Sequence, residues 1–329
     1  MRDTGSMPTP RARFIGTLYA LAAGLLWGLV FIAPLLLPQY PAMLLSFGRY
    51  LAFGLIALPL GWLDRQRLAG LTPADWLEAL KLAAVGNLLY YLCLAAAIQR
   101  AGGPLPTMII GTLPVVIALV SNRRDALRDG RQPWLKMLPS LALIAAGIAC
   151  VNRSEWQQLQ RAGMADLPRY FSGAALAVGA VVCWTWYPLR NADWLRDHPG
   201  RSPSAWATAQ GLATLPLAGL GFAAWWISSA WVGEADFALP LGPTPARFVA
   251  LMLVMGLFAS WLGTRFWNEA SQRLPTTLVG QLIVFETLAA LAYAFALRGS
   301  WPEPATALGI GLLMAGVWWA LRARPSPVH

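Results

Sequence analysis

Two ionisable side chains lie deep inside long apolar stretches of this 329-residue sequence. Glu286 stands about ten residues into its stretch, roughly 15 Å along a helix that rises 1.5 Å per residue. A carboxyl group away from water is disfavoured in its charged form, so Glu286 is able to bind and release a proton. Arg49 carries a planar guanidinium that grips a carboxylate through two parallel hydrogen bonds. A structural hydrogen bond is the alternative for Glu286, and an interfacial position or a helix cap is the alternative for Arg49.

Polar and aromatic residues in other apolar stretches are candidates to line the same site. Asn87, Tyr90 and Tyr91 are spaced i, i+3 and i+4, so a helix places them on one face. We expect Trp27 and Trp184 to form aromatic walls of this site. Hydrogen bonding between helices and ordinary aromatic packing are the respective alternatives. We include all five, with the two charged residues, in the predicted substrate-binding set, and Glu286 is also the predicted proton-coupling group.

A further charged pair stands at the end of another apolar stretch. Arg265 and Glu269 are spaced i, i+4, which predicts a local salt bridge or an element of a gate. No catalytic motif accompanies these groups, because the sequence holds neither an HExxH zinc motif nor a GxxxxGK[ST] phosphate loop. The two histidines fall in polar segments, and the three cysteines form no CxxC pair. We expect no enzyme activity, no metal and no cofactor.

The elements that position these residues follow from the composition. Hydrophobic residues make up 57% of the chain and charged residues 12%, and the mean hydropathy is +0.52. Surface-to-volume scaling prevents a soluble fold from burying so much apolar surface. A bilayer core about 30 Å thick needs roughly 20 apolar residues per helix. Ten stretches qualify: 14–36, 42–62, 77–98, 105–121, 135–151, 170–189, 205–231, 248–268, 276–297 and 305–321.

Lys and Arg fall mainly in alternate connections between these stretches. If the N-terminus is cytoplasmic, 18 of the 25 Lys and Arg lie inside, 6 lie outside, and Arg49 lies within the membrane. Cytoplasmic loops carry such an excess, so both termini are predicted to be cytoplasmic. The net charge of +10 follows from this orientation. No basic stripe with interleaved aromatics indicates nucleic-acid binding, and the expected partners are the bilayer, a small-molecule substrate and protons.

The two halves of the sequence repeat each other. The first block pairs Phe14, Gly16, Ala20, Ala23 and Trp27 with Phe171, Gly173, Ala177, Ala180 and Trp184, at a constant offset of 157. A second block pairs Leu105-Pro106-Thr107 with Leu274-Pro275-Thr276 at an offset of 169. Each half then holds five helices, and an odd number inverts the second half relative to the first. We therefore predict an all-α polytopic membrane protein built from two inverted five-helix repeats.

The domain boundaries follow from the repeat and the polar segments. We expect a disordered cytoplasmic lead over 1–13, the first repeat over 14–151, a periplasmic connection over 152–169, the second repeat over 170–321 and a cytoplasmic tail over 322–329. Inverted repeats are typical of alternating-access transporters, whose substrate site lies near the bilayer midplane. The repeat counterpart of Glu286 is Ile117, so the acid breaks the symmetry at that depth.

The sequence resembles a known family, the ten-helix drug/metabolite transporters of the EamA type, over nearly its whole length. The resemblance rests on four segments, which read GLLWG over 24–28, GRYLA over 48–52, MIIGTLPVV over 108–116 and GQLIVFETL over 280–288. It implies a secondary transporter of the bacterial inner membrane, commonly an exporter of amino acids or related small metabolites. It does not specify the substrate, the coupling ion or the oligomeric state.

Two other functions compete with amino-acid export. A broad drug or lipophilic-cation exporter of the same fold would use Glu286 for the cation, whereas a carboxylate would use Arg49 and a zwitterion both. A membrane enzyme or sensor is the second competitor. The lack of a catalytic motif argues against an enzyme, and neither end of the sequence is long enough to add an output domain.

Overall fold

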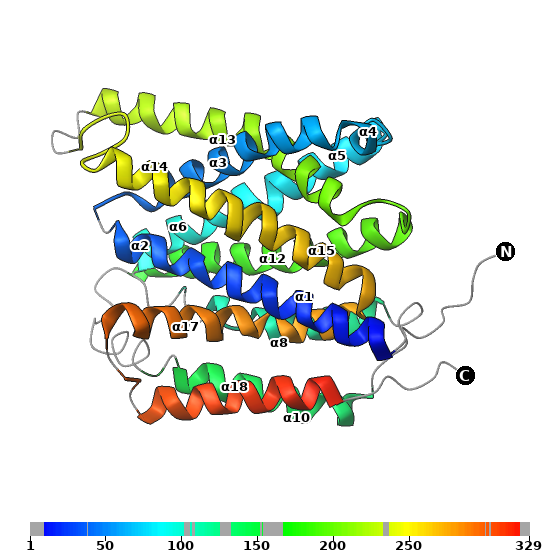
Figure 1. The fold of residues 1–329 in the computed structure, drawn as a ribbon. Helices are drawn as coiled ribbons and strands as arrows, with labels where there is room; N and C mark the ends of the chain where they lie inside the picture. Colours follow the sequence, from blue (N-terminus) through cyan, green and yellow to red (C-terminus); the bar gives the residue numbers. More distant parts are fainter. Residues whose placement is uncertain are drawn as a thin grey trace.

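The computed structural model describes residues 10–37, 39–101, 106, 109–125, 133–151, 153, 167–232, 237–299, 301–302 and 304–322. Within these ranges the chain is helical and holds no strand. The helices run side by side across the view of Figure 1, with the start of α1 and the end of α18 at the same end of the bundle. The first half comprises α1 (Pro10–Gly28), η1 (Leu29–Phe31), α2 (Ile32–Leu36), α3 (Ala42–Leu63), α4 (Arg65–Leu68), α5 (Pro73–Leu82), η2 (Ala83–Leu89), α6 (Tyr90–Ala101), α8 (Leu113–Arg124) and α10 (Trp134–Val151).

The second half contains α12 (Leu167–Asp197), α13 (Pro203–Val232), α14 (Pro245–Val254), η3 (Met255–Leu262), α15 (Gly263–Arg273), α16 (Thr276–Leu282), α17 (Val284–Arg298) and α18 (Pro304–Arg322). Helices therefore occupy the predicted apolar stretches wherever those stretches are described. Some helices extend into segments predicted to be connections. α1 begins at Pro10, so residues 10–13 are helical and the expectation of a disordered lead is wrong for them, while α12 begins at Leu167 and continues to Asp197.

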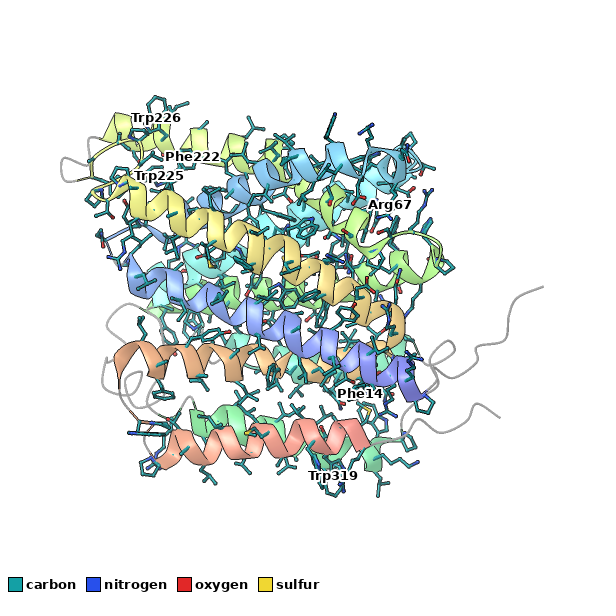
Figure 2. The ribbon with its side chains drawn as sticks, in the orientation of Figure 1. Phe14, Arg67, Phe222, Trp225, Trp226 and Trp319 are labelled. Atoms are coloured by element: carbon teal, nitrogen blue, oxygen red, sulfur yellow. The ribbon has the colours of Figure 1, made fainter. Side chains whose placement is uncertain are left out.

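Within the described ranges, six segments are long and apolar enough to cross a membrane by length and composition. They are Met43–Leu63, Pro73–Leu94, Pro168–Asp197, Pro203–Ser229, Pro245–Arg273 and Thr276–Leu297, and Trp134–Cys150 and Pro304–Ala320 are shorter apolar helices. Large apolar side chains cover the outside of the bundle. Phe14, Trp226 and Trp319 are 65%, 44% and 44% exposed and project outward in Figure 2. Exposed apolar surface of this extent suits contact with lipid.

Helices of the two halves pack against each other in pairs. α3 lies against α13, α8 against α16, and α10 against α18. α1 of the first half packs along α15 and α17 of the second, while α6 packs along α12. No half therefore folds around a separate core, and the middle of the bundle is built from both halves.

The third apolar helix of each half contains a π-helical segment. η2 interrupts the helix that runs from α5 to α6, and η3 interrupts the helix that runs from α14 to α15. π-helical turns are rare and recur at functional sites, because the wider turn re-aims side chains and main-chain groups. Neither segment was predicted from the sequence. The two turns bring Asn87 and Ser260 to the middle of the bundle.

Candidate functional site

Arg49 lies near the middle of α3 and contacts η3 of the other half. Its Nε donates to the Ser260 hydroxyl over 2.9 Å, and its Nη2 donates to the Ala259 carbonyl oxygen over 3.2 Å. Its guanidinium carbon lies 4.9 Å from the centre of the neighbouring Tyr50 ring. Nη1 has no hydrogen-bond acceptor among the described residues. The π-helical turn thus holds one edge of the guanidinium and leaves the other edge available.

A small cavity borders Arg49. It has room for about one water molecule and is lined by Val30, Ala33, Leu45, Ser46, Arg49, Tyr91, Met252 and Met255. The Ser46 side chain is 3% exposed, and its hydroxyl has no hydrogen-bond partner in the described part of the chain. Three residues that carry hydrogen-bond donors, Ser46, Arg49 and Tyr91, therefore line one space. The two methionines supply an apolar, adaptable wall opposite these donors.

Glu286 lies next to a local irregularity in the helical segment Thr276–Leu297. α16 ends at Leu282, and Glu286 stands in the first turn of α17. Ile283 between them keeps helical dihedral angles (φ −60°, ψ −23°), and the Glu286 N–H donates to its carbonyl oxygen over 3.0 Å, so the helix continues through this point with a tighter turn. Gly24 of α1 permits this arrangement, because a Cβ there would lie 3.1 Å from the Glu286 backbone nitrogen.

The Glu286 carboxyl group is partly buried and interacts electrostatically with Arg49, Tyr50 and Tyr90. It forms no hydrogen bond or ion pair with a side chain in the described residues. Two effects therefore oppose each other at Glu286. Desolvation disfavours the carboxylate, whereas the Arg49 charge favours it. A group balanced in this way can exchange a proton when its surroundings change.

Aromatic rings pack together between the α6 and α1 sides of the site. Tyr90 stacks on Trp184 with ring centres 4.8 Å apart, and Trp184 stacks on Tyr187 at 5.1 Å. Trp27 meets Trp184 edge-on at 5.8 Å and Trp267 at 4.9 Å. The predicted aromatic residues Trp27, Tyr90 and Trp184 thus pack together. Of these three, Tyr90 also interacts electrostatically with Glu286.

Asn87, Tyr90 and Tyr91 make different contacts. The Asn87 amide nitrogen donates to the Thr214 hydroxyl of α13 over 3.3 Å, Tyr90 stacks on Trp184 of α12, and Tyr91 lines the cavity. Tyr90 and Tyr91 also interact electrostatically with each other, and both interact with Arg49. The assignment of all three to one substrate-binding face stays a prediction.

The predicted pair of Arg265 and Glu269 is not formed. Glu269 forms its ion pair with Arg273, the next i+4 neighbour, and also accepts through its carbonyl from Arg273 over 2.7 Å. The Arg265 guanidinium lies over the Trp261 ring at 5.7 Å, and its Nε is buried with no hydrogen-bond acceptor in the described ranges. The sequence spacing permits both pairs, and packing of Arg265 on the indole decides between them.

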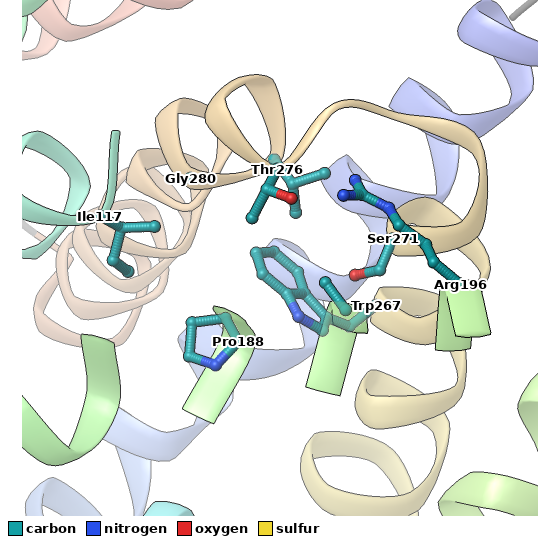
Figure 3. A pocket seen from close by; sticks show the side chains of 9 residues that line it. Ile117, Pro188, Arg196, Trp267, Ser271, Thr276 and Gly280 are labelled. Atoms are coloured by element: carbon teal, nitrogen blue, oxygen red, sulfur yellow. The ribbon is translucent and has the colours of Figure 1, made fainter. Parts of the chain in front are cut away.

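A second small pocket lies nearer the end of the bundle that carries the termini. Figure 3 shows Pro188, Trp267, Ser271 and Thr276 gathered around it, with Arg196 beside them. The Trp267 indole nitrogen and the Ser271 hydroxyl are buried without a hydrogen-bond partner among the described residues. The space is too small for a water molecule, which needs about 10–15 Å³ for its centre. This pocket is a packing defect between helices in the present conformation.

A buried chain of hydrogen bonds beside the aromatic rings was not predicted. The Tyr187 hydroxyl donates to the side-chain oxygen of Gln210 over 2.9 Å. The Gln210 side-chain nitrogen donates to the side-chain oxygen of Asn191 over 3.0 Å, and the Asn191 side-chain nitrogen donates to the side-chain oxygen of Asn268 over 2.8 Å. The Trp206 indole nitrogen also donates to Asn191 over 2.9 Å. These contacts fix α12, α13 and α15 to one another. The sequence analysis did not identify Ser46 or Ser260 as site residues either. Of the two, only Ser46 could have been found from the sequence, because it stands three residues before Arg49 and so lies on the same face of a helix.

Comparisons with known proteins give this geometry its context. Residues 14–153 match the EamA-like transporter family. The inner membrane protein YtfF of Escherichia coli (strain K12) is 53% identical over 314 residues, which cover 94% of this chain and 96% of the relative. A crystal structure of a protein 18% identical superposes with a TM-score of 0.68 over 93% of this chain and 96% of that chain, so the two share a fold. The chain therefore belongs to the EamA-like transporter family.

Proposed function

We propose that the protein is a secondary active transporter of the bacterial inner membrane that exports amino acids or related small metabolites by alternating access. The observation that carries the proposal is the arrangement of Arg49 and Glu286. Opposite charges from α3 and α17 interact across the middle of the bundle, and no ion pair joins them among the described residues. Each charge keeps capacity for a ligand. A zwitterion presents a carboxylate to Arg49 and an ammonium group to Glu286.

The donors around the cavity support a carboxylate ligand. Arg49 Nη1, the Ser46 hydroxyl and the Tyr91 hydroxyl can all donate towards one pair of carboxylate oxygens. Ser260 and Ala259 hold the guanidinium in place, so little side-chain entropy is lost on binding. Met252 and Met255 offer apolar surface to the remainder of a small molecule.

The fold supports alternating access through a symmetry that sequence comparison alone did not reveal. Thr72-Pro73-Ala74 and Thr244-Pro245-Ala246 begin the third helix of each half, and η2 and η3 both start ten residues after their proline. The pairing of α1 with α15 and of α6 with α12 is the pattern that two inverted repeats would produce. The space at Arg49 holds about one water molecule, so binding a metabolite requires the helices to separate.

The local irregularity between α16 and α17 supports a site at the level of Glu286. Transporters of inverted-repeat design bind substrates at departures from regular helix. Here the helix continues, and its regular hydrogen-bond pattern changes at Ile283, one turn before Glu286. We propose that Glu286 couples transport to protons by binding either a proton or the substrate ammonium group.

Export of lipophilic cations is the second candidate function. It is favoured by Tyr90 and Trp184, whose stacked rings lie beside the Glu286 charge. An aromatic face attracts a cation by about 0.5–2 kcal/mol. A cation needs Glu286 and the rings and gains nothing from Arg49, so the two candidate functions make opposite demands on Arg49.

Counterflow in proteoliposomes tests the proposal. Purified protein is reconstituted with an unlabelled compound inside, and uptake of the same labelled compound is measured for amino acids, nucleosides and cationic drugs. The proposal expects counterflow of amino acids that Arg49→Lys weakens. Counterflow of cationic drugs alone, equal in the parent and in Arg49→Lys, would establish the second candidate instead.

A further inference from the structure

Asp75 joins α5 of the first half to α12 of the second. Its Oδ2 accepts from the Thr72 backbone nitrogen over 2.8 Å and from the Thr72 hydroxyl over 2.9 Å, which caps the start of α5. Its Oδ1 accepts from the Trp194 indole nitrogen over 2.8 Å and lies 3.6 Å from His198 Nε2. Both carboxylate oxygens thus accept hydrogen bonds, and the side chain is 6% exposed.

Glu78 makes a second connection one turn further along α5. Its two oxygens accept from Arg190 Nε over 2.5 Å and from Arg190 Nη2 over 3.1 Å, a bidentate pair. The Glu78 side chain is 7% exposed, and the ammonium group of Lys81 lies 3.8 Å away on the same helix. Arg190 is the partner from the other half. A buried carboxylate that loses such a partner pays its desolvation without compensation.

Two more contacts reach across at the same end of the bundle. Arg124, at the end of α8, donates to Asp193 of α12 over 2.9 Å and to the Leu189 carbonyl over 3.4 Å. Arg201, in the turn between α12 and α13, donates to the Gly70 carbonyl oxygen after α4. Each contact has one partner before residue 151 and one after residue 167, so all of them join the two halves.

The partners on the α12 side stand at regular intervals. Arg190 and Trp194 are four residues apart, Asp193 lies three residues after Arg190, and His198 follows four residues after Trp194, directly after the end of α12. Spacings of three and four place them along one side of a helix. The first three lie on the part of α12 that extends beyond the predicted span. The π-helical segment η2, which contains Asn87, follows α5 directly. A helix bends or shifts most readily where its hydrogen-bond ladder changes, and η2 provides that place next to α5.

From these contacts we infer that α5 is a gate segment, latched to α12 by Asp75 and Glu78 and hinged at η2. The latch has to break for the central cavity to open towards the end of the bundle that carries the termini. The gate residues are then Asp75, Glu78 and their partners on the α12 side, and a gate role for Arg265 and Glu269 stays a prediction. The role of the latch as a gate rests on the proposed transport function. The contacts that form the latch do not, because they join the two halves whatever the protein transports.

Accessibility of the cavity tests the latch without any substrate. Ser46→Cys places a reporter thiol on the cavity in a chain whose native cysteines are replaced by alanine. A membrane-impermeant maleimide is added to membrane vesicles of both orientations, and the labelling rate is measured. Arg67→Cys, on the exposed α4 beside the latch, identifies the orientation that presents this end to the reagent.

Glu78→Gln removes the charge that holds Arg190 and keeps the shape of the side chain. We expect it to raise the labelling rate of the Ser46→Cys reporter by about tenfold, only in vesicles that present the latch end. The charge-exchanged chain with Glu78→Arg and Arg190→Glu should return the rate towards that of the parent. Asp64→Asn is the matched control, because the 3.2 Å pair of Asp64 and Arg67 lies at the same end within one half.

Three results would overturn the inference. They are an unchanged labelling rate in Glu78→Gln, an equal increase in Asp64→Asn, or an increase in vesicles of the opposite orientation. A labelling rate that stays high in the charge-exchanged chain would also count against the inference. That chain carries both charges in exchanged positions, so it restores the latch if residues 78 and 190 form an ion pair. If the latch behaves as expected and counterflow finds no metabolite, the proposed function fails while the latch stands.

Discussion

The Arg49 guanidinium is fixed to the π-helical turn of η3, because its Nε donates to the Ser260 hydroxyl over 2.9 Å. The bond joins α3 of the first half to a helix of the second at the middle of the bundle. It also orients the free edge of the guanidinium towards the cavity that Ser46 and Tyr91 line. A single residue thus links the packing of the two halves to the geometry of the proposed carboxylate site.

Arg49→Lys tests this double role. Lysine keeps the positive charge but offers no planar fork, so it cannot hold η3 and a carboxylate at the same time. We expect the apparent affinity for a carboxylate substrate in counterflow to fall about tenfold, the value of one charged hydrogen bond. Ser260→Ala is the matched control, since it removes the contact with η3 and leaves the guanidinium. Equal affinity in the parent, Arg49→Lys and Arg49→Ala would assign Arg49 a structural role.

The close approach of α1 and α17 makes a stability prediction. A Cβ on Gly28 would lie 2.7 Å from the Ala289 Cβ, so a side chain there must push α17 and Glu286 away from Trp27. We expect Gly28→Val to destabilise the protein by about 1–3 kcal/mol, measured as a lower thermal midpoint in detergent. Gly219→Ala on α13 is the control, because no described atom lies within 4 Å of its Cβ. A midpoint that drops equally in both variants would contradict this account.

The orientation of the chain is open to direct labelling. Gln160→Cys stands in the predicted periplasmic connection, and Arg67→Cys stands at the end of the bundle that carries the termini. With both termini cytoplasmic, an impermeant maleimide added to intact cells should label residue 160 and spare residue 67. Labelling of residue 160 from the cytoplasm alone would overturn both the inverted repeats and the orientation.

The course of the helices could be predicted because hydropathy determines it. The predicted stretch 42–62 becomes Ala42–Leu63, and 205–231 becomes Pro203–Val232. In lipid each backbone N–H and C=O must be bonded within its own segment, so an apolar stretch of this length has to be a helix. The repeat offset makes Trp27 and Trp184 counterparts, and their ring centres lie 5.8 Å apart in the structure, a contact that the offset alone does not predict.

The interruptions of the helices could not be predicted in this way. η2, η3 and the irregularity at Ile283 carry no hydropathy signal, since their residues are as apolar as their neighbours. They depend on contacts made between helices, such as the bond from Arg49 to the Ala259 carbonyl. The predicted pairing of Glu269 with Arg265 was wrong for the same reason, because i, i+4 neighbours stand on both sides of Glu269 and packing selects Arg273.

Glu286→Gln tests the proposed proton coupling. Glutamine resembles the protonated carboxyl group in shape and hydrogen bonding but cannot release a proton, so the exchange between a proton and the substrate ammonium group is lost. We expect transport driven by a pH gradient to fall to the level of empty liposomes, while counterflow of the same substrate continues at a reduced rate. Raising the pH on both sides should reduce gradient-driven transport by the parent, since fewer Glu286 carboxyl groups then carry a proton, and should leave counterflow by Glu286→Gln unchanged.

Glu269→Gln is the matched control for this prediction. Glu269 is an acid of the same half that is already paired with Arg273 at the end of α15, so its loss removes a charge without touching the central site. It should keep the response to a pH gradient. If Glu286→Gln responds to the gradient as the parent does, Glu286 is a packed hydrogen-bonding group at the start of α17 and another residue couples the proton. If gradient-driven transport and counterflow are lost together while the thermal midpoint is unchanged, Glu286 binds substrate without acting as the proton carrier.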